Sequence, residues 1–229
     1  MLIGLVLPCV AFSQAPQQPL LSVGFRTYFW RVVSSKPPVV ADNDAVLPDY
    51  VAPTVGYLDP ERGFTDMKVA EGQISPRYRY RGPNPITFVS GEGGEVLGTV
   101  SLDPSMHQAL LIFFPGGKNG ESYRILPIEV SPEKINRGQA LVINLCQDPV
   151  AVEMGSNQML LNRGQSQSIR LSDAKNRRLP VRLAIKNDDG KWKKKIDEDL
   201  IIDPKGRLIF LLHEPRNNQF RIVTLNADI

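Results

Sequence analysis

The feature that most constrains the fold is a series of short β-strand candidates at nearly even spacing along the chain. Turn sequences such as Gly93-Gly94, Asn162-Arg163-Gly164 and Asn217-Asn218 separate them. These residues adopt the backbone conformations of tight turns at little cost. No window of helical length keeps its apolar residues at a 3.6-residue period. Evenly spaced strands with such turns predict an all-β sandwich or barrel.

The strand candidates share β-rich composition and an apolar or alternating pattern. They cover residues 20–33, 77–80, 86–90, 96–102, 109–114, 123–130, 140–145, 150–154, 158–161, 166–171, 180–187, 192–202, 207–213 and 219–225. The first two are separated by a Pro-rich connection, 36–60, whose prolines exclude a helix and most central strands. We expect at most a short edge strand there, around Val51–Leu58.

An internal repeat divides this series into two halves. Each half has a strand end, an Asp-Pro turn at Asp103-Pro104 or Asp203-Pro204, an apolar strand, a proline-marked loop and a strand that begins aromatic-Arg-Ile. Upstream, Ile86–Val89 corresponds to Leu183–Lys186 in the sequence. A unit of about a hundred residues is the size of a small β-sandwich. We therefore predict two tandem Ig-like β-sandwich domains that arose by duplication; chance recurrence of strands and turns is the alternative.

A second, shorter sequence similarity, which we call the second echo, relates two turns. Ile135–Gln139 and Leu161–Gln165 both place Asn-Arg-Gly-Gln after an aliphatic residue. An Asn-x-Gly turn that leads into a strand can be selected twice independently. We interpret this echo as shared turn chemistry and not as part of the duplication.

The N-terminus is typical of an export signal. An apolar run over Leu2–Phe12 precedes small and polar residues, although no Lys or Arg stands before it. The run is too short to span a bilayer. We expect a periplasmic or extracellular protein with no transmembrane segment in the mature chain. The expected divisions are a signal peptide over 1–15, an N-terminal domain over 16–130 and a C-terminal domain over 131–229.

Cysteine and histidine are too few for the commonest metal and disulfide frameworks. Once Cys9 leaves with the signal, Cys146 remains alone and cannot form an intramolecular disulfide. A lipid anchor on Cys9 is a minor alternative. The ligand types of a blue-copper site are present in His107, His213, Cys146, Met154 and Met159. Because Cys146 lacks a nearby downstream His, we expect neither a metal nor another cofactor.

The sequence also lacks a convincing catalytic pattern. No Gly-x-Ser-x-Gly turn occurs, and the glycine-rich Ser90–Gly94 lacks the Lys and helix of a phosphate loop. Asp197–Asp199 could supply the paired carboxylates of a glycosidase. They lie in the charged run Lys193–Asp199, which is more typical of a solvated strand or a protected sheet edge. We expect a protein that is not an enzyme.

The best candidate for a binding surface combines aromatic rings with guanidinium groups. The residues concerned are Arg77, Tyr78, Arg79, Tyr80, Arg81, Tyr28 and Trp30, with Arg26 beside them. Alternation along a strand puts Tyr78 and Tyr80 on one face, and likewise Tyr28 and Trp30. Such rings could stack on sugars or bind a protein; the alternative is that they pack a core.

The stretch from about Tyr78 to Leu225 resembles a group of exported bacterial all-β sandwich proteins of unknown function. The residues that carry this resemblance are Tyr80-Arg81-Gly82, Ala109–Phe114, Gly138–Leu145, Leu161–Gly164 and Gly190-Lys191-Trp192. The resemblance implies a compartment and a fold, and no activity. A net charge of +3 is too small to indicate a nucleic-acid partner. We predict a non-enzymatic envelope protein that binds another envelope protein or glycan, with a carbohydrate-binding module as the alternative.

The export signal predicts a specific processed terminus. We expect the first thirteen to fifteen residues to be removed on export, because Ala11 and Ser13 provide the small residues that precede a cleavage site. N-terminal sequencing of exported protein measures this directly. A mature chain that still begins at Met1 would contradict the prediction.

Overall fold

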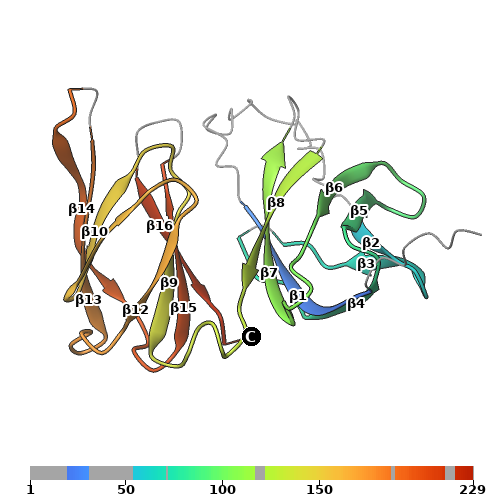
Figure 1. Ribbon diagram of the computed structural model, residues 1–229, viewed down its shortest axis with the longest axis horizontal. Coiled ribbons are helices and arrows are strands. Elements are labelled where there is room, and N and C mark those ends of the chain that lie inside the picture. The colour runs from blue at the N-terminus through green and yellow to red at the C-terminus, as the bar shows by residue number, and fades with distance from the viewer. Residues whose placement is uncertain are drawn as a thin grey trace, which may run out of the picture. The chain divides into compact units, whose positions relative to one another are not determined.

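The computed structural model describes residues 20–30, 54–70, 72–116, 122–186, 189–214 and 220–228. The predicted signal peptide, Cys9 and most of the Pro-rich connection lie outside these residues. The described residues form sixteen strands and no helix, so they contain no helix that could cross a membrane. The predicted all-β class is confirmed (Figure 1).

The strands fall into two consecutive groups of eight. The first group is β1 (Leu21–Phe29), β2 (Val55–Asp59), β3 (Gly63–Met67), β4 (Tyr78–Gly82), β5 (Ile86–Ser90), β6 (Val96–Val100), β7 (Gln108–Gly116) and β8 (Ser122–Glu129). The second group is β9 (Gln139–Asn144), β10 (Val150–Met154), β11 (Asn157–Leu161), β12 (Ser166–Arg170), β13 (Arg178–Lys186), β14 (Trp192–Ile201), β15 (Arg207–His213) and β16 (Arg221–Asn226).

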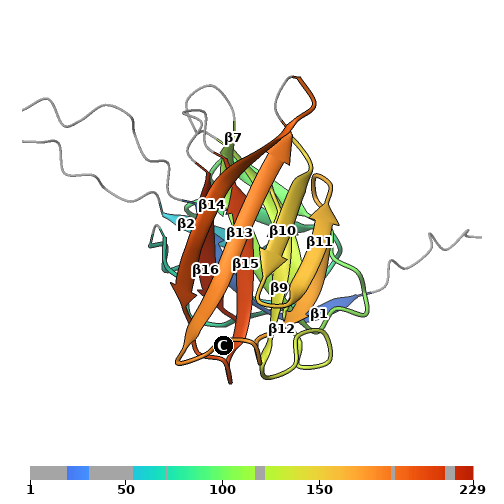
Figure 2. The ribbon, with the colours of Figure 1, turned by 90° about the vertical axis from the view of Figure 1, so that its left-hand side faces the viewer.

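The chain divides into two compact units between Ile128 and Glu129. The sequence placed this boundary two residues later, after Val130. The first unit contains the sheets β4-β1-β7-β8 and β3-β2-β5-β6. The second contains β12-β9-β15-β16 and β11-β10-β13-β14, the latter seen face-on in Figure 2. Each unit is thus a sandwich of two four-stranded sheets, and tandem β-sandwiches are confirmed.

The two units have the same topology. Adding eight to each strand number of the first unit reproduces both sheet orders of the second. The first strand of each unit pairs parallel with the seventh and antiparallel with the fourth. A register shift occurs in the fifth strand of both units, between Phe88 and Val89 and between Leu183 and Ala184. The predicted structural equivalence of the halves is therefore confirmed.

One detail of the sequence alignment was wrong. It matched Ile86 with Leu183, whereas the strand pairing makes Phe88 the equivalent of Leu183, because each lies just before the register shift. Phe88 pairs with Tyr57 and Leu183 with the equivalent Val152. A slip of two residues keeps every side chain on its face of the sheet, so a hydrophobic pattern alone cannot detect it.

The two Asp-Pro turns have the same hydrogen bonds. The Asp103 carboxylate accepts from the backbone N–H of Ser105 at 2.9 Å, and that of Asp203 accepts from Lys205 at 3.1 Å. In both, the aspartate carbonyl also accepts from the N–H three residues later. An aspartate that caps its own turn explains why this residue recurs before β7 and β15.

The second echo is shared turn chemistry, as interpreted from the sequence. Gln139 and Gln165 each accept, through the side-chain oxygen, from the backbone N–H of the asparagine three residues earlier. Gly138 and Gly164 both have φ of +74°, in the left-handed region that favours glycine. These turns precede β9 and β12, which are not equivalent strands.

The two cores differ in composition although their topology is the same. The first is rich in rings, with Phe25, Phe29, Tyr57, Phe88 and Phe113 all buried. Phe88 and Phe113 meet edge to face, with ring centroids 5.0 Å apart, a favourable geometry for aromatic pairs. The second core is built mainly from Val, Leu and Ile around Phe210. Cys146 belongs to this second core as a buried free thiol, whose pKa burial raises to about 12.

Two strands in the first unit depart from the sequence expectation. Strand β3 was missed, because its residues Gly-Phe-Thr-Asp-Met neither alternate clearly nor form an apolar run. Strand β2, expected at a sheet edge, is an inner strand between β3 and β5. In the second unit, the charged run lies on β14, which is an edge strand with mostly exposed side chains. Its charges therefore occupy a sheet edge, as the sequence indicated.

The repeat predicts matched effects of truncation in the two units. Leu111 on β7 belongs to the first core, whereas Ile209 on β15, which is equally buried, is not part of the second core cluster, because it alternates with the core residues Leu208 and Phe210. Replacing either with Ala should lower the free energy of unfolding by about 2–5 kcal/mol, because a cavity is left. Chemical denaturation measures the loss. The control Leu160→Ala, at a side chain that is 55% exposed, should cost less than about 0.5 kcal/mol. Equal effects of all three changes would contradict the prediction.

Candidate functional site

Strands β1 and β4 separate the predicted rings from the predicted guanidinium groups. The two strands pair antiparallel, with Val23 opposite Tyr80 and Gly24 opposite Arg79. Val23 and Tyr80 belong to the hydrophobic core. Since alternate residues point to opposite faces, Arg79 and its neighbours at Arg77 and Arg81 lie on the face away from that core.

The tyrosines of β4 are core residues. Tyr80 is 4% exposed, its hydroxyl donates to the Pro83 carbonyl at 2.7 Å, and burial raises its pKa. Tyr78 packs against the core, and its hydroxyl accepts from the Lys68 N–H at 2.8 Å. The ring of Tyr57 lies 6.1 Å from that of Tyr80. The core-packing alternative thus describes Tyr78 and Tyr80, and the rings of β4 offer no open platform.

Tyr28 and Trp30 lie elsewhere. Tyr28 is buried and lies on the opposite face of β1 from Phe25 and Phe29. Trp30 is half-buried, and its ring lies 6.0 Å from that of Tyr28 and 5.1 Å from that of Phe114. The structure therefore does not bring the four predicted rings together into one surface.

The three arginines of the predicted set do come together, at a pocket of about 540 Å³. Its lining residues come from β1, the turn after β2, β4 and the loop before β7. They are Ser22, Val23, Gly24, Asp59, Glu61, Arg62, Arg77, Arg79, Tyr80, Arg81 and His107. We call this the arginine pocket. Sequence reasoning missed Arg62, because β3 and the turn that leads into it were not recognised.

The cations of the arginine pocket are not neutralised by ion pairs. No guanidinium of Arg62, Arg77, Arg79 or Arg81 forms an ion pair or a hydrogen bond with any residue that the structure describes. The pocket also holds the carboxylates of Asp59 and Glu61. Asp59 is engaged in its turn, where it accepts from the backbone N–H groups of Glu61 and Arg62 at 2.9 and 3.1 Å. The lining thus has four guanidinium groups against two carboxylates.

Gly24 shapes the floor of this pocket. A Cβ atom built on Gly24 would lie 2.7 Å from Nη2 and 2.8 Å from Nε of Arg77. The Arg77 guanidinium therefore lies directly against the backbone of β1, in space that only glycine leaves open. The Gly24 N–H donates to the His107 carbonyl at 3.0 Å. This hydrogen bond connects the floor of the pocket to the residue that directly precedes β7.

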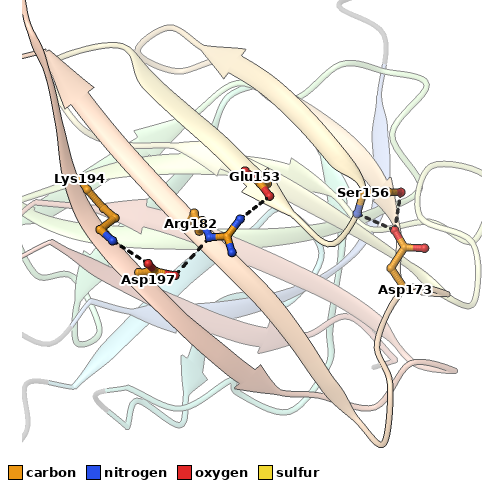
Figure 3. A network of polar contacts seen from close by, with 6 residues as sticks. All are labelled: Glu153, Ser156, Asp173, Arg182, Lys194 and Asp197. Carbon is orange, nitrogen blue, oxygen red and sulfur yellow. Dashed lines mark hydrogen bonds and ion pairs between the residues drawn. The ribbon is translucent and has the colours of Figure 1, made fainter.

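Charged groups of the second unit behave differently. Arg182 donates to Glu153 at 2.9 Å and to Asp197 at 3.3 Å, and Lys194 donates to Asp197 at 2.7 Å (Figure 3). The hydrogen bond from Lys194, followed by that from Arg182, lowers the pKa of Asp197. Glu153, Arg182 and Lys194 line a hollow of about 400 Å³ on the face of the β10–β13 pair. Because its charges are mutually satisfied, this hollow is the weaker candidate.

The groups considered for a metal site do not assemble. Among the described residues, no three His, Cys, Asp or Glu side chains lie close enough to hold a metal ion. His107 belongs to the first unit, and His213 belongs to the second with Cys146. Burial raises the pKa of Cys146 to about 12, which keeps it a neutral thiol and a poor nucleophile.

Comparison with known proteins adds no functional assignment. The chain matches no protein-family model, and the search of curated proteins found no significant similarity. The function is therefore argued from the arginine pocket and its surroundings.

The burial of Tyr80 leads to a paired prediction. Tyr80→Ser should lower the free energy of unfolding by about 3–5 kcal/mol, because a core ring is lost. Tyr80→Phe keeps the ring and removes the hydrogen bond to Pro83, so it should cost about 0.5–1.5 kcal/mol. Urea unfolding of both variants measures the two effects. A Tyr80→Ser protein as stable as the wild type would show that the ring is not part of the core.

Proposed function

We propose that this protein is a non-enzymatic binding protein of the cell envelope, which holds an acidic envelope macromolecule through the arginine pocket. The observation that carries the proposal is the set of unpaired guanidinium groups at Arg62, Arg77, Arg79 and Arg81. Guanidinium groups bind carboxylate, sulfate and phosphate through paired hydrogen bonds. Cations gathered in a hollow attract an anion more strongly than the same cations scattered over a surface.

The expected location in the envelope comes from the apolar run at the N-terminus. The absence of an enzymatic activity remains an expectation from the sequence. Both fit a two-sandwich scaffold whose candidate site carries hydrogen-bond donors but, among the pocket-lining residues, no nucleophile paired with a base. A binding role requires only that the donors face an acidic partner.

The carbohydrate-binding alternative depends on exposed rings, since sugars stack on aromatic faces. Tyr80 is the one Phe, Tyr or Trp among the described residues that line the pocket, and its ring is buried. We therefore favour recognition of charge over recognition of sugar rings. An acidic glycan satisfies the proposal, whereas a neutral glycan does not.

Retention on an acidic polymer tests this function. The triple variant Arg77→Gln/Arg79→Gln/Arg81→Gln should bind immobilised acidic polysaccharide about tenfold more weakly than the wild type at low salt. Three exposed ion pairs at about 0.5 kcal/mol each give that change in Kd. A neutral polysaccharide of similar length should retain neither protein. Circular dichroism checks that the variant is folded.

The matched control removes three exposed arginines from the second unit. Arg163→Gln/Arg170→Gln/Arg178→Gln changes the net charge by the same amount, and all three side chains are exposed. This control should keep wild-type retention. If both triple variants lose retention equally, net charge and not the arginine pocket is responsible. If the wild type binds neutral polysaccharide equally well, the carbohydrate-binding alternative is correct.

A further inference from the structure

Three arginines lie near Gly24, on the face of β1 and β4 that is turned away from the core. Arg79 lies directly opposite Gly24 in the β1–β4 pairing, and the guanidinium of Arg77 lies against Gly24 itself. Arg26 is the next residue of β1 on the same face; it does not line the pocket, but it lies close enough to Arg77 for that charge to lower its pKa. We call Arg26, Arg77 and Arg79, arranged around Gly24, the arginine cradle.

The arginine cradle is an unfavourable arrangement for the free protein. Like charges that lie close together repel each other. Burial, and then the positive charge of Arg77, lower the pKa of Arg26. Arg26 donates to the Ser75 carbonyl at 3.1 Å, but no described carboxylate forms an ion pair with any residue of the cradle. A bound anion would relieve this repulsion.

The second unit shows that the fold does not require the arginine cradle. The two units pair their first strand with the fourth and the seventh in the same way, so Gln139 is the equivalent of Gly24 and Arg170 that of Arg79. At the next positions, Leu141 and Ser168 face each other where the first unit has Arg26 and Arg77. Of the three arginines of the cradle, only Arg79 has an arginine at the equivalent position. Gly24, Arg26 and Arg77 are particular to the first unit.

The open edge of β4 does not explain these residues either. An extended peptide could add to an edge strand and pair acidic side chains with the arginines. The Arg79 carbonyl, however, already accepts from the Tyr57 hydroxyl at 2.9 Å. At Gly82, a Cβ would lie 2.5 Å from Pro60, so the chain is covered there too. The edge of β4 is therefore partly occupied, and the pocket that the arginines line lies on the face of the sheet, where we place the ligand.

The chemistry of the cradle selects among anions. Guanidinium groups are donors only, and each presents a planar fork of N–H groups. A carboxylate offers one charge and two oxygens, whereas a phosphate monoester offers about −1.5 to −2 charges and three terminal oxygens. The four guanidinium groups that line the pocket, set against two carboxylates, match the second. We infer that the arginine pocket recognises a phosphate group through the guanidinium groups that line it, with that of Arg77 held against Gly24. This inference rests on the proposed function and names the acidic group of its partner.

Thermal unfolding at constant ionic strength tests the inference. The probes are inorganic phosphate and a linear polyphosphate, with polyglutamate as the carboxylate control and sodium chloride to balance the salt. A ligand that binds only the folded protein raises Tm in proportion to its occupancy. Phosphate probes should raise the Tm of the wild type, and polyglutamate should bind at least tenfold more weakly than polyphosphate of equal charge.

Two variants and one control distinguish binding at the arginine cradle from a general effect of positive charge. Arg77→Gln should weaken phosphate binding at least tenfold while leaving the Tm of the free protein unchanged or higher, because a like-charge contact is removed. Gly24→Ala keeps every arginine and fills the floor, so it should also lose the phosphate response. Arg170→Gln, at the position equivalent to Arg79, should keep the response. A response that survives in Arg77→Gln and Gly24→Ala overturns the inference.

The remaining outcomes identify the source of the phosphate. They also distinguish failure of the phosphate inference from failure of the proposed function. A Kd for polyphosphate at least tenfold below that for inorganic phosphate supports a phosphate carried on a polymer, and equal values support free phosphate. If polyglutamate binds as tightly as polyphosphate, the phosphate inference fails and the proposed acidic partner stands. If no acidic polymer binds, both fail.

Discussion

The parallel pairing of the first strand with the seventh is the interaction on which each unit depends. It joins β1 to β7 and β9 to β15, segments from opposite ends of a unit, and thereby places the first strand in the middle of its sheet. Joining such distant segments costs conformational entropy, and the burial of apolar side chains offsets that cost. In the first unit these side chains include Phe25 and Phe29 on the core face of β1. The other face of the same strand provides Gly24 and Arg26 of the arginine cradle.

The two units show how little of a core's composition a topology prescribes. An aromatic core and an aliphatic one support the same sheet orders, the same strand directions and the same register shift. Cores tolerate such exchange when volume and patterning are kept. The surfaces of the two units differ as well. The second unit neutralises Arg182 and Lys194 with carboxylates, whereas the first leaves Arg77 and Arg79 unneutralised. This difference in charge neutralisation between the two units is therefore the most informative guide to function.

A single strand explains why the candidate binding residues had to be separated. Along β4, period-two alternation sends Tyr78 and Tyr80 into the core and Arg79 and Arg81 outward. The sequence predicts this alternation, and it correctly pairs the tyrosines on one face. It does not say which face is covered, because that depends on the second sheet of the sandwich. With the tyrosines buried, the guanidinium groups alone remain for a ligand.

The sequence by itself determined the class, the repeat and most strands, because these follow from local properties. Turn residues such as Asn162 and Gly164, the capped turns at Asp103 and Asp203, and the period-two patterns act over a few neighbouring positions. Only the tertiary structure decided which strands pair, the two-residue register of Phe88 against Leu183, and the inner position of β2. It alone brought Arg62 to Arg79 and Arg77 to Gly24. These contacts join segments far apart in sequence, and nothing in a local pattern specifies the distance between them.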